Sequence, residues 1–227
     1  MLHNQFIHGS IELNNEDLHF VPFKKQDLEY LEKVFAMRKR TDKELWLIYF
    51  EEITSIEEVL IIMRNIDLDL DDDVVVGFDK TDQIVLYEVY RIGPNSDIQY
   101  NEIGIWYKNE NNETGLHMTT INKWHRRYDL KGHNFKVTAL EEPPFITKIL
   151  QNTISGQNEM EGSFIDLLNL LSKTMNFSYT LKLPPDNSWG GLQENGSWNG
   201  MMNLLINEIV DICKLEFCSI RFLKEIV

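Results

Sequence analysis

The stretch Phe135-Lys-Val-Thr-Ala-Leu-Glu-Glu-Pro-Pro-Phe145 decides how the C-terminal part of the chain folds. Its apolar start predicts a strand over residues 135–140. Two prolines follow, and because proline has no backbone N–H to donate to a neighbouring strand, the chain must leave the sheet there. We therefore expect a strand that ends in an outward loop, with Phe145 on that loop.

Helices and strands alternate downstream of this loop. The pair Gly162-Ser163 begins a predicted helix, and its apolar residues share one face: Ile165, Leu168, Leu171 and Met175. A strand over 178–183, a second helix begun by Asn199-Gly200 and a strand over 210–212 follow. The order strand, helix, strand, helix, strand is typical of a layered α/β unit.

A similar order precedes it. Helical spacing predicts a helix over 26–37, and apolar runs predict strands over 44–50 and 74–78. Ser55 and Glu58 form a capping-box pattern that begins another helix. The polar turn 79–82 is suited to a hairpin that joins the strand over 74–78 to one over 83–92.

Residues 93–131 connect the two α/β regions. They predict a loop over 93–96, a short strand over 102–108 and a polar loop over 109–115. A basic patch then precedes the apolar start at Phe135, and it consists of Lys123, Arg126, Arg127, Lys131 and His133. We place the domain boundary near residue 130, which divides the chain into 1–130 and 131–227.

Composition narrows the class of protein. The chain has 227 residues, with 22 Lys and Arg against 36 Asp and Glu and a net charge of −14. An acidic surface repels nucleic acid and anionic membranes, so neither is an expected partner. Hydrophobic residues make up 43%, which is enough for a folded core.

Targeting signals are not visible in this chain. Its first residues, Met1–Gly9, have no cationic start and no apolar run, so they predict no signal peptide. A membrane helix needs about 20 apolar residues, and no run approaches that length. The chain stops inside an amphipathic stretch, so we expect it to be a fragment of a longer protein.

Enzymatic and metal-binding motifs are not apparent either. The run of aspartates from Asp67 to Asp73 has Asp72 and Phe78 where an EF-hand loop needs glycine and glutamate, so we interpret it as a solvated turn. The histidines lack zinc-site spacing, and no nucleophile motif or phosphate-binding glycine loop is present. We expect no enzyme activity, no metal and no cofactor.

Cysteines and sequons bear on the cellular compartment. Cys213 and Cys218 can pair with each other, pair with cysteines beyond the chain, or remain reduced and buried. Three sequons begin at Asn112, Asn176 and Asn195, and they favour a protein of the secretory pathway.

Five motifs in order resemble the first ligand-binding segment of ionotropic glutamate receptors. They are Phe135–Phe145, Gly162–Leu168, Met175–Tyr179, Asn195–Met201 and Val210–Ile212. Further upstream, four stretches are similar to arthropod chemosensory ionotropic receptors: Asp73–Phe78, Leu86–Ile92, Glu102–Trp106 and Arg126–Gly132.

The resemblance implies a fold and a function. Residues 131–227 would form an incomplete periplasmic-binding-protein-like lobe of a ligand-binding clamshell, and 1–130 a partial α/β amino-terminal domain. The whole protein would be a ligand-gated cation channel of the plasma membrane, with this portion extracellular. The expected partners are co-receptor subunits, in a tetramer, and a small odorant or tastant.

The resemblance also assigns ligand-binding positions. Phe145 matches an aromatic residue that packs over the ligand, although an ordinary core aromatic explains it equally well. Glu216, Cys218 and Leu223 occupy the places of the family's proline, threonine and carboxylate-binding arginine, and Arg221 is two residues away from the last. We therefore expect an amine or a neutral compound instead of glutamate as the ligand.

Alternatives remain open at this point. The pocket can be vestigial in a subunit that serves assembly, and the chain can be a soluble solute-binding protein or a non-functional truncated product. A synaptic-type glutamate receptor subunit is a further alternative, which the missing arginine disfavours.

Overall fold

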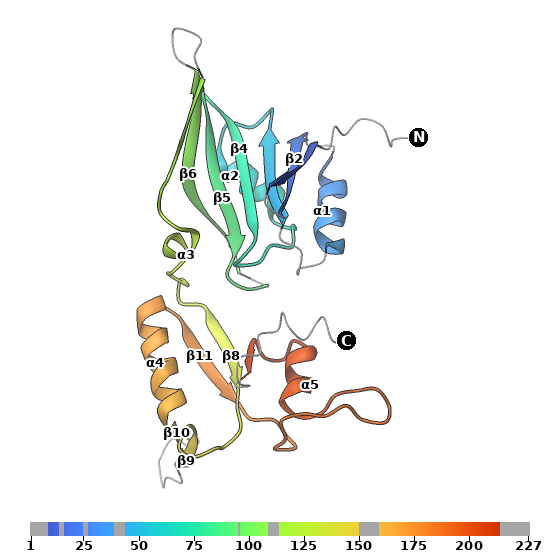
Figure 1. Ribbon diagram of the computed structural model, residues 1–227, viewed down its shortest axis with the longest axis vertical. Coiled ribbons are helices and arrows are strands. Elements are labelled where there is room, and N and C mark those ends of the chain that lie inside the picture. The colour runs from blue at the N-terminus through green and yellow to red at the C-terminus, as the bar shows by residue number, and fades with distance from the viewer. Residues whose placement is uncertain are drawn as a thin grey trace. The chain divides into compact units, whose positions relative to one another are not determined.

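The chain divides into two units, Met1–Arg127 (unit 1) and Tyr128–Val227 (unit 2). The computed structural model describes residues 9–13, 16–24, 27–38, 44–94, 96–108, 114–149 and 159–213 (Figure 1). The sequence placed the domain boundary near residue 130. Within the described ranges, no helix is both long and apolar enough to cross a membrane.

Unit 1 is built on one seven-stranded sheet with the strand order β1-β2-β3-β4-β5-β6-β7. Strands β2, β3 and β4 are parallel to one another, and the other neighbours are antiparallel. The elements are β1 (Gly9–Leu13), β2 (Glu16–Phe23), α1 (Leu28–Met37), β3 (Glu44–Phe50), α2 (Ile56–Met63), β4 (Asp73–Lys80), β5 (Gln83–Arg91), β6 (Ile98–Lys108), β7 (Thr114–Met118) and α3 (Lys123–Arg126).

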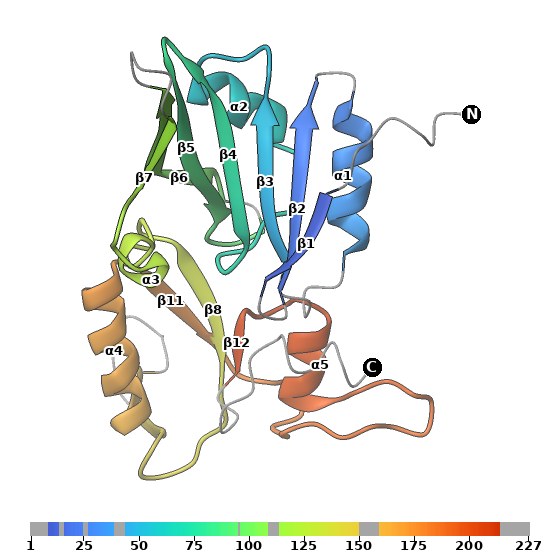
Figure 2. The same ribbon diagram turned by 45° about the horizontal axis from the view of Figure 1, so that its top comes forward.

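Helices α1 and α2 share the core of unit 1 (Figure 2). Each connects two neighbouring parallel strands, and crossovers of the same hand lie on the same face of a sheet. Leu31 of α1 and Val59 of α2 are fully buried in one apolar cluster with Ile48, Val76 and Val89 of the sheet. Alternate residues of β3 and β4 supply this cluster, as the period of a strand requires.

Two features of unit 1 that short sequence patterns predict, a helix cap and a hairpin, are confirmed. Ser55 caps α2, since its Oγ accepts a hydrogen bond from the backbone N–H of Glu58 at 3.4 Å. The predicted hairpin joins β4 to β5, with Lys80 opposite Gln83 and Thr81 at φ 58°. The predicted polar loop over 109–115 is wrong at its end, because β7 already begins at Thr114.

Unit 2 contains a three-stranded parallel sheet with the order β11-β8-β12 and a two-stranded antiparallel sheet of β9 and β10. Its elements are β8 (Asn134–Thr138), β9 (Thr147–Ile149), β10 (Glu159–Glu161), α4 (Ser163–Met175), β11 (Ser178–Lys182), α5 (Gly200–Ile206) and β12 (Ile212–Cys213). The predicted alternation of strands and helices is confirmed for β8, α4, β11, α5 and β12.

Two details of unit 2 correct the sequence-based expectations. Leu171 was expected on the buried face of α4, but it is 37% exposed, while Ile165 and Leu168 are buried. Asn199 precedes α5 without capping it through its side chain, because its Oδ1 instead accepts a hydrogen bond from the N–H of Gly191 at 2.6 Å.

Candidate functional site

The carboxyl edge of the sheet in unit 2 is the candidate site. All three strands run parallel, and Thr138 pairs with both Lys182 and Cys213, so the strands end at one level. Ligands of open α/β sheets bind outside the carboxyl ends of the strands. The loops that follow β8 and β11 leave from this edge, and the first of them carries Phe145.

The loop after β8 is a tight turn that projects Phe145. The N–H of Phe145 donates to the carbonyl of Glu142 at 2.9 Å, and Glu142 and Ile146 exchange two backbone hydrogen bonds of 2.8 and 3.0 Å. Ile146 is fully buried, whereas Phe145 is 48% exposed. The aromatic ring is therefore about half exposed in unit 2.

Helix α4 holds this turn in place. Its second residue, Phe164, donates its N–H to the carbonyl of Phe145 at 3.1 Å. Gly162 has φ 125°, and a Cβ at this position would lie 2.4 Å from the carbonyl oxygen of Phe145. Only glycine allows both this backbone conformation and this close approach. The position of Phe145 thus depends on a glycine in the chain ahead of α4.

Thr138 is a residue of this edge that the sequence did not single out. It ends β8, is fully buried, and its Oγ1 has no hydrogen-bond partner among the described residues. A buried hydroxyl without a partner costs about 1–3 kcal/mol. Opposite it, Cys213 is buried and its Sγ lies 3.9 Å from the sulfur of Met201. In the sequence, Thr138 was recognisable only as a polar residue near the end of an apolar strand.

The loop between β11 and α5 is organised by Asp186. Its Oδ2 accepts hydrogen bonds from the Ser188 hydroxyl and from the N–H of Gly200, both at 2.9 Å. The Ser188 hydroxyl, followed by the backbone N–H of Gly200, lowers the pKa of the Asp186 carboxyl despite some desolvation. The carboxylate therefore fixes the entry to α5.

The remaining predicted site residues fall into two groups. Glu216, Cys218, Leu223 and Asn112 lie outside the described residues. Asn176 and Asn195 are described, and both are exposed. Asn176 follows α4 in the left-handed conformation, and Asn195 lies in the loop before α5. Of the four predicted ligand-binding positions, Phe145 is therefore the one that the structure places.

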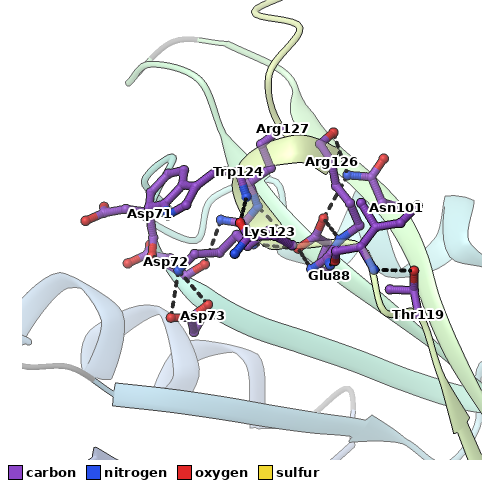
Figure 3. A network of polar contacts seen from close by, with 12 residues as sticks. Asp71, Asp72, Asp73, Glu88, Asn101, Thr119, Lys123, Trp124, Arg126 and Arg127 are labelled. Carbon is purple, nitrogen blue, oxygen red and sulfur yellow. Dashed lines mark hydrogen bonds and ion pairs between the residues drawn. The ribbon is translucent and has the colours of Figure 1, made fainter.

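A second polar cluster lies within unit 1, around Glu88 (Figure 3). Glu88 is 2% exposed. Arg126 binds both of its carboxylate oxygens at 2.8 and 2.7 Å, Arg127 binds Oε2 at 2.9 Å, and Asn101 donates to Oε1 at 2.8 Å. Burial alone would raise the pKa of Glu88, but the hydrogen bonds from Arg126 and Asn101 and the charge of Arg127 outweigh it and lower that pKa.

Arg127 of this cluster, together with Lys123 and Arg38, also contacts the aspartate run, so the interpretation as a solvated turn is wrong for Asp72, whose side chain is 11% exposed. Arg127 donates to the carbonyls of Leu70 and Asp72 at 2.6 and 2.9 Å, and Lys123 contacts the carboxylate of Asp73 at 2.7 Å. Arg38 forms an ion pair with Asp72. Lys123, Arg126 and Arg127 of the predicted basic patch thus form structural ion pairs within unit 1.

Comparisons with known proteins match unit 2 and part of unit 1. A family model described as the ligated ion channel L-glutamate- and glycine-binding site matches residues 133–221. Human glutamate receptor ionotropic, kainate 1, is 31% identical over 166 residues, which are 71% of this chain and 17% of that receptor. Mouse kainate 5 is 31% identical over 143 residues, 63% of this chain and 14% of that receptor.

A solved structure is also similar. The ligand-binding domain of an ionotropic glutamate receptor from Mnemiopsis leidyi, in complex with D-serine, is 26% identical with a TM-score of 0.35. The match covers 40% of this chain and 38% of that chain.

The matched segment is similar to the ligand-binding part of ionotropic glutamate receptors. Residues 133–221 match the family model of the ligated ion channel L-glutamate- and glycine-binding site, and unit 2 is a partial lobe with a periplasmic-binding-protein-like α/β fold. The chain spans about a sixth of the length of kainate 1. Because the match covers 71% of the chain, more than unit 2 contains, it also extends into unit 1.

Proposed function

We propose that the chain supplies the extracellular ligand-binding portion of a chemosensory ligand-gated cation channel subunit. Residues 131–227 would form part of the first clamshell segment, and 1–130 the end of an amino-terminal domain. The match of residues 133–221 to the family model carries this proposal. The resemblance of the upstream stretches to arthropod chemosensory receptors favours the chemosensory subtype, in a tetramer with co-receptors at the plasma membrane.

The mechanism follows from differential affinity. A ligand that binds the closed clamshell more tightly than the open one shifts the equilibrium toward closure, and closure pulls on the linkers to the pore. In this proposal Phe145 packs over the ligand from the carboxyl edge of unit 2. The exposed ring and the turn that fixes its backbone suit that role.

The ligand class follows from the place of the family's arginine. This place is Leu223, and a hydrogen bond from arginine to a carboxylate contributes about 1.5–3 kcal/mol. A leucine leaves the carboxylate of glutamate unpaired, whereas Glu216 accepts a cation. An amine or a neutral odorant is therefore the proposed ligand.

Calorimetric titration of the full chain with glutamate, pentylamine and pentan-1-ol tests the ligand class. We expect pentylamine or pentan-1-ol to bind more tightly than glutamate. Leu223→Arg should increase affinity for glutamate about 10- to 100-fold, as 1.5–3 kcal/mol predicts, whereas Leu223→Met, which adds no charge, should not. Micromolar glutamate binding by the unmodified chain overturns the proposal, and binding of none of the three compounds favours a vestigial pocket.

A second candidate is a glutamate receptor subunit of the kainate type. The similarity to human kainate 1 and mouse kainate 5 favours it. Leu223 at the place of the arginine opposes it. The same titration separates the two candidates, because a kainate-type subunit would bind glutamate without the Leu223→Arg substitution.

A further inference from the structure

The two described sequons differ in the state of their asparagine amide. Asn195 lies in the loop between β11 and α5, which extends from unit 2 in Figures 1 and 2. Its Oδ1 accepts hydrogen bonds from the N–H and the hydroxyl of Ser197, at 3.0 and 2.7 Å. Its Nδ2 makes no hydrogen bond to another described residue, so the nitrogen that carries a glycan is available.

The surroundings of Asn195 leave room for a large group. Residues 193–197 form a turn, in which Gln193 donates to the carbonyl of Ser197 at 2.8 Å and Gly196 to that of Gln193 at 2.9 Å. The side chains from Leu192 to Ser197 are exposed. A Cβ added at Gly196 would meet no atom within 4 Å. The sequon thus lies at an open loop tip, where bulky additions are tolerated.

Asn176 is engaged by the fold. Its Nδ2 donates to the carboxylate of Asp129 at 2.7 Å, and its carbonyl accepts the N–H of Gly132 at 2.7 Å. The hydroxyl of Ser178, the third residue of this sequon, accepts a hydrogen bond from Asn134 at 2.9 Å, from the strand paired with β11. A sugar on Asn176 would crowd the Asp129 carboxylate and the 129–132 turn.

We infer that the folded protein carries an N-glycan on Asn195 and none on Asn176. The Nδ2 of Asn195 attacks the anomeric carbon of a lipid-diphosphate-linked oligosaccharide and forms the N-glycosidic bond. The bond from that carbon to the diphosphate oxygen breaks, and the lipid diphosphate leaves with its electron pair. The proton lost from Nδ2 passes through a base of the transferase to the released diphosphate.

This inference rests on the proposed function, because the transfer occurs in the secretory lumen. It also predicts which surface of unit 2 can contact another subunit. A glycan at the tip of the loop before α5 is bulky and solvated, so it keeps that surface out of tight subunit contacts. Asn176, at the end of α4, would leave its surface open to such contacts.

Secretion of the full chain from insect cells, behind a leader and with a tag that carries an additional sequon, tests the inference. Folded, monodisperse protein is treated with an amidase that leaves aspartate at each glycan-bearing asparagine, and every sequon is then scored by peptide mass. We expect Asn195 to be occupied as fully as the tag sequon, and Asn176 to be unmodified. An unmodified Asn195 beside an occupied tag, or an occupied Asn176, overturns the inference.

Matched variants assign the glycan to this sequon. Asn195→Gln and Ser197→Ala should each abolish the modification at residue 195, and Ser197→Thr, which retains the hydroxyl, should preserve it. Asn176→Gln should change no glycan-bearing peptide. Retention of the modification in Ser197→Ala contradicts the sequon assignment. The result is independent of the ligand titration, so a glycan without ligand binding leaves this inference standing while the proposed ligand class fails.

Discussion

Two polar regions of the molecule differ in how completely their hydrogen bonds are used. In unit 1, both oxygens of the buried Glu88 carboxylate are occupied by Arg126, Arg127 and Asn101. At the carboxyl edge of unit 2, an aromatic ring is half exposed at Phe145 and the buried hydroxyl of Thr138 has no partner among the described residues. A saturated cluster stabilises a fold, whereas an edge with unused groups can accept a ligand.

The Glu88 cluster gives the largest expected effect. Glu88→Gln removes the carboxylate that both Arg126 and Arg127 bind, and removal of one partner of a buried ion pair costs about 3–5 kcal/mol. We expect the free energy of unfolding of unit 1 to fall by that amount in urea titrations, with faster hydrogen exchange in β5. Glu52→Gln, at an exposed position, is the control and should change little.

Acid titration sharpens the same test. The folded state lowers the pKa of Glu88, so its contribution to stability is present above the unfolded pKa and is lost as the pH falls through the folded pKa. The wild type should therefore lose this part of its stability on acidification, and Glu88→Gln should lack that loss. Equal acid sensitivity of both proteins would assign the loss to other carboxylates.

Substitution of Gly162, beside the carboxyl edge of the sheet in unit 2, gives the next largest expected effect. Gly162→Ala introduces a Cβ 2.4 Å from the carbonyl oxygen of Phe145 at φ 125°, so both backbone strain and a clash oppose it. Gly132→Ala is the matched control, because its φ is 72° but a Cβ there meets nothing within 4 Å. We expect Gly162→Ala to cost about 1–3 kcal/mol more than the control, measured as free energy of unfolding.

A displaced turn is the second consequence of Gly162→Ala. Amide exchange of residues 142–146 should become faster in this variant and remain unchanged in Gly132→Ala. Identical costs for the two substitutions would show that backbone conformation alone, and not the approach of α4 to the loop, makes glycine necessary at residue 162.

The sequence was sufficient where one local signal decided the structure. The cap at Ser55 and the hairpin over 79–82 require only neighbouring residues, and both are present. Strand β7 was not predicted because its side chains are exposed or half-buried; the side chain of Leu116, for example, is 61% exposed. The strand is defined instead by its pairing with β6. No periodic burial pattern exists in such an edge strand.

The candidate site was predictable in part for the same reason. The two prolines indicate the outward loop that carries Phe145, but the local sequence left open whether its ring is exposed. The burial of Thr138 and the contact of Gly162 with Phe145 depend on segments that meet only after folding. The ion pairs of the aspartate run belong to this second class, since Asp73 and Lys123 are 50 residues apart.

Phe145→Ala separates a ligand contact from a packing residue. The ring is 48% exposed, so its removal should change the free energy of unfolding by no more than about 0.5 kcal/mol. If the ring packs over the ligand, affinity for the tightest of the three titrated compounds should fall about 3- to 10-fold, which corresponds to an aromatic contact of 0.5–1.5 kcal/mol.

Trp189→Ala is the matched control for Phe145→Ala. Trp189 is another exposed aromatic residue of unit 2, at 41%, but it lies in the loop before α5. We expect this substitution to leave both stability and affinity unchanged. Unchanged affinity in Phe145→Ala would remove Phe145 from the binding site. A large loss of stability would instead make the turn after β8 a structural element like the Glu88 cluster, and the contrast between the two regions would disappear.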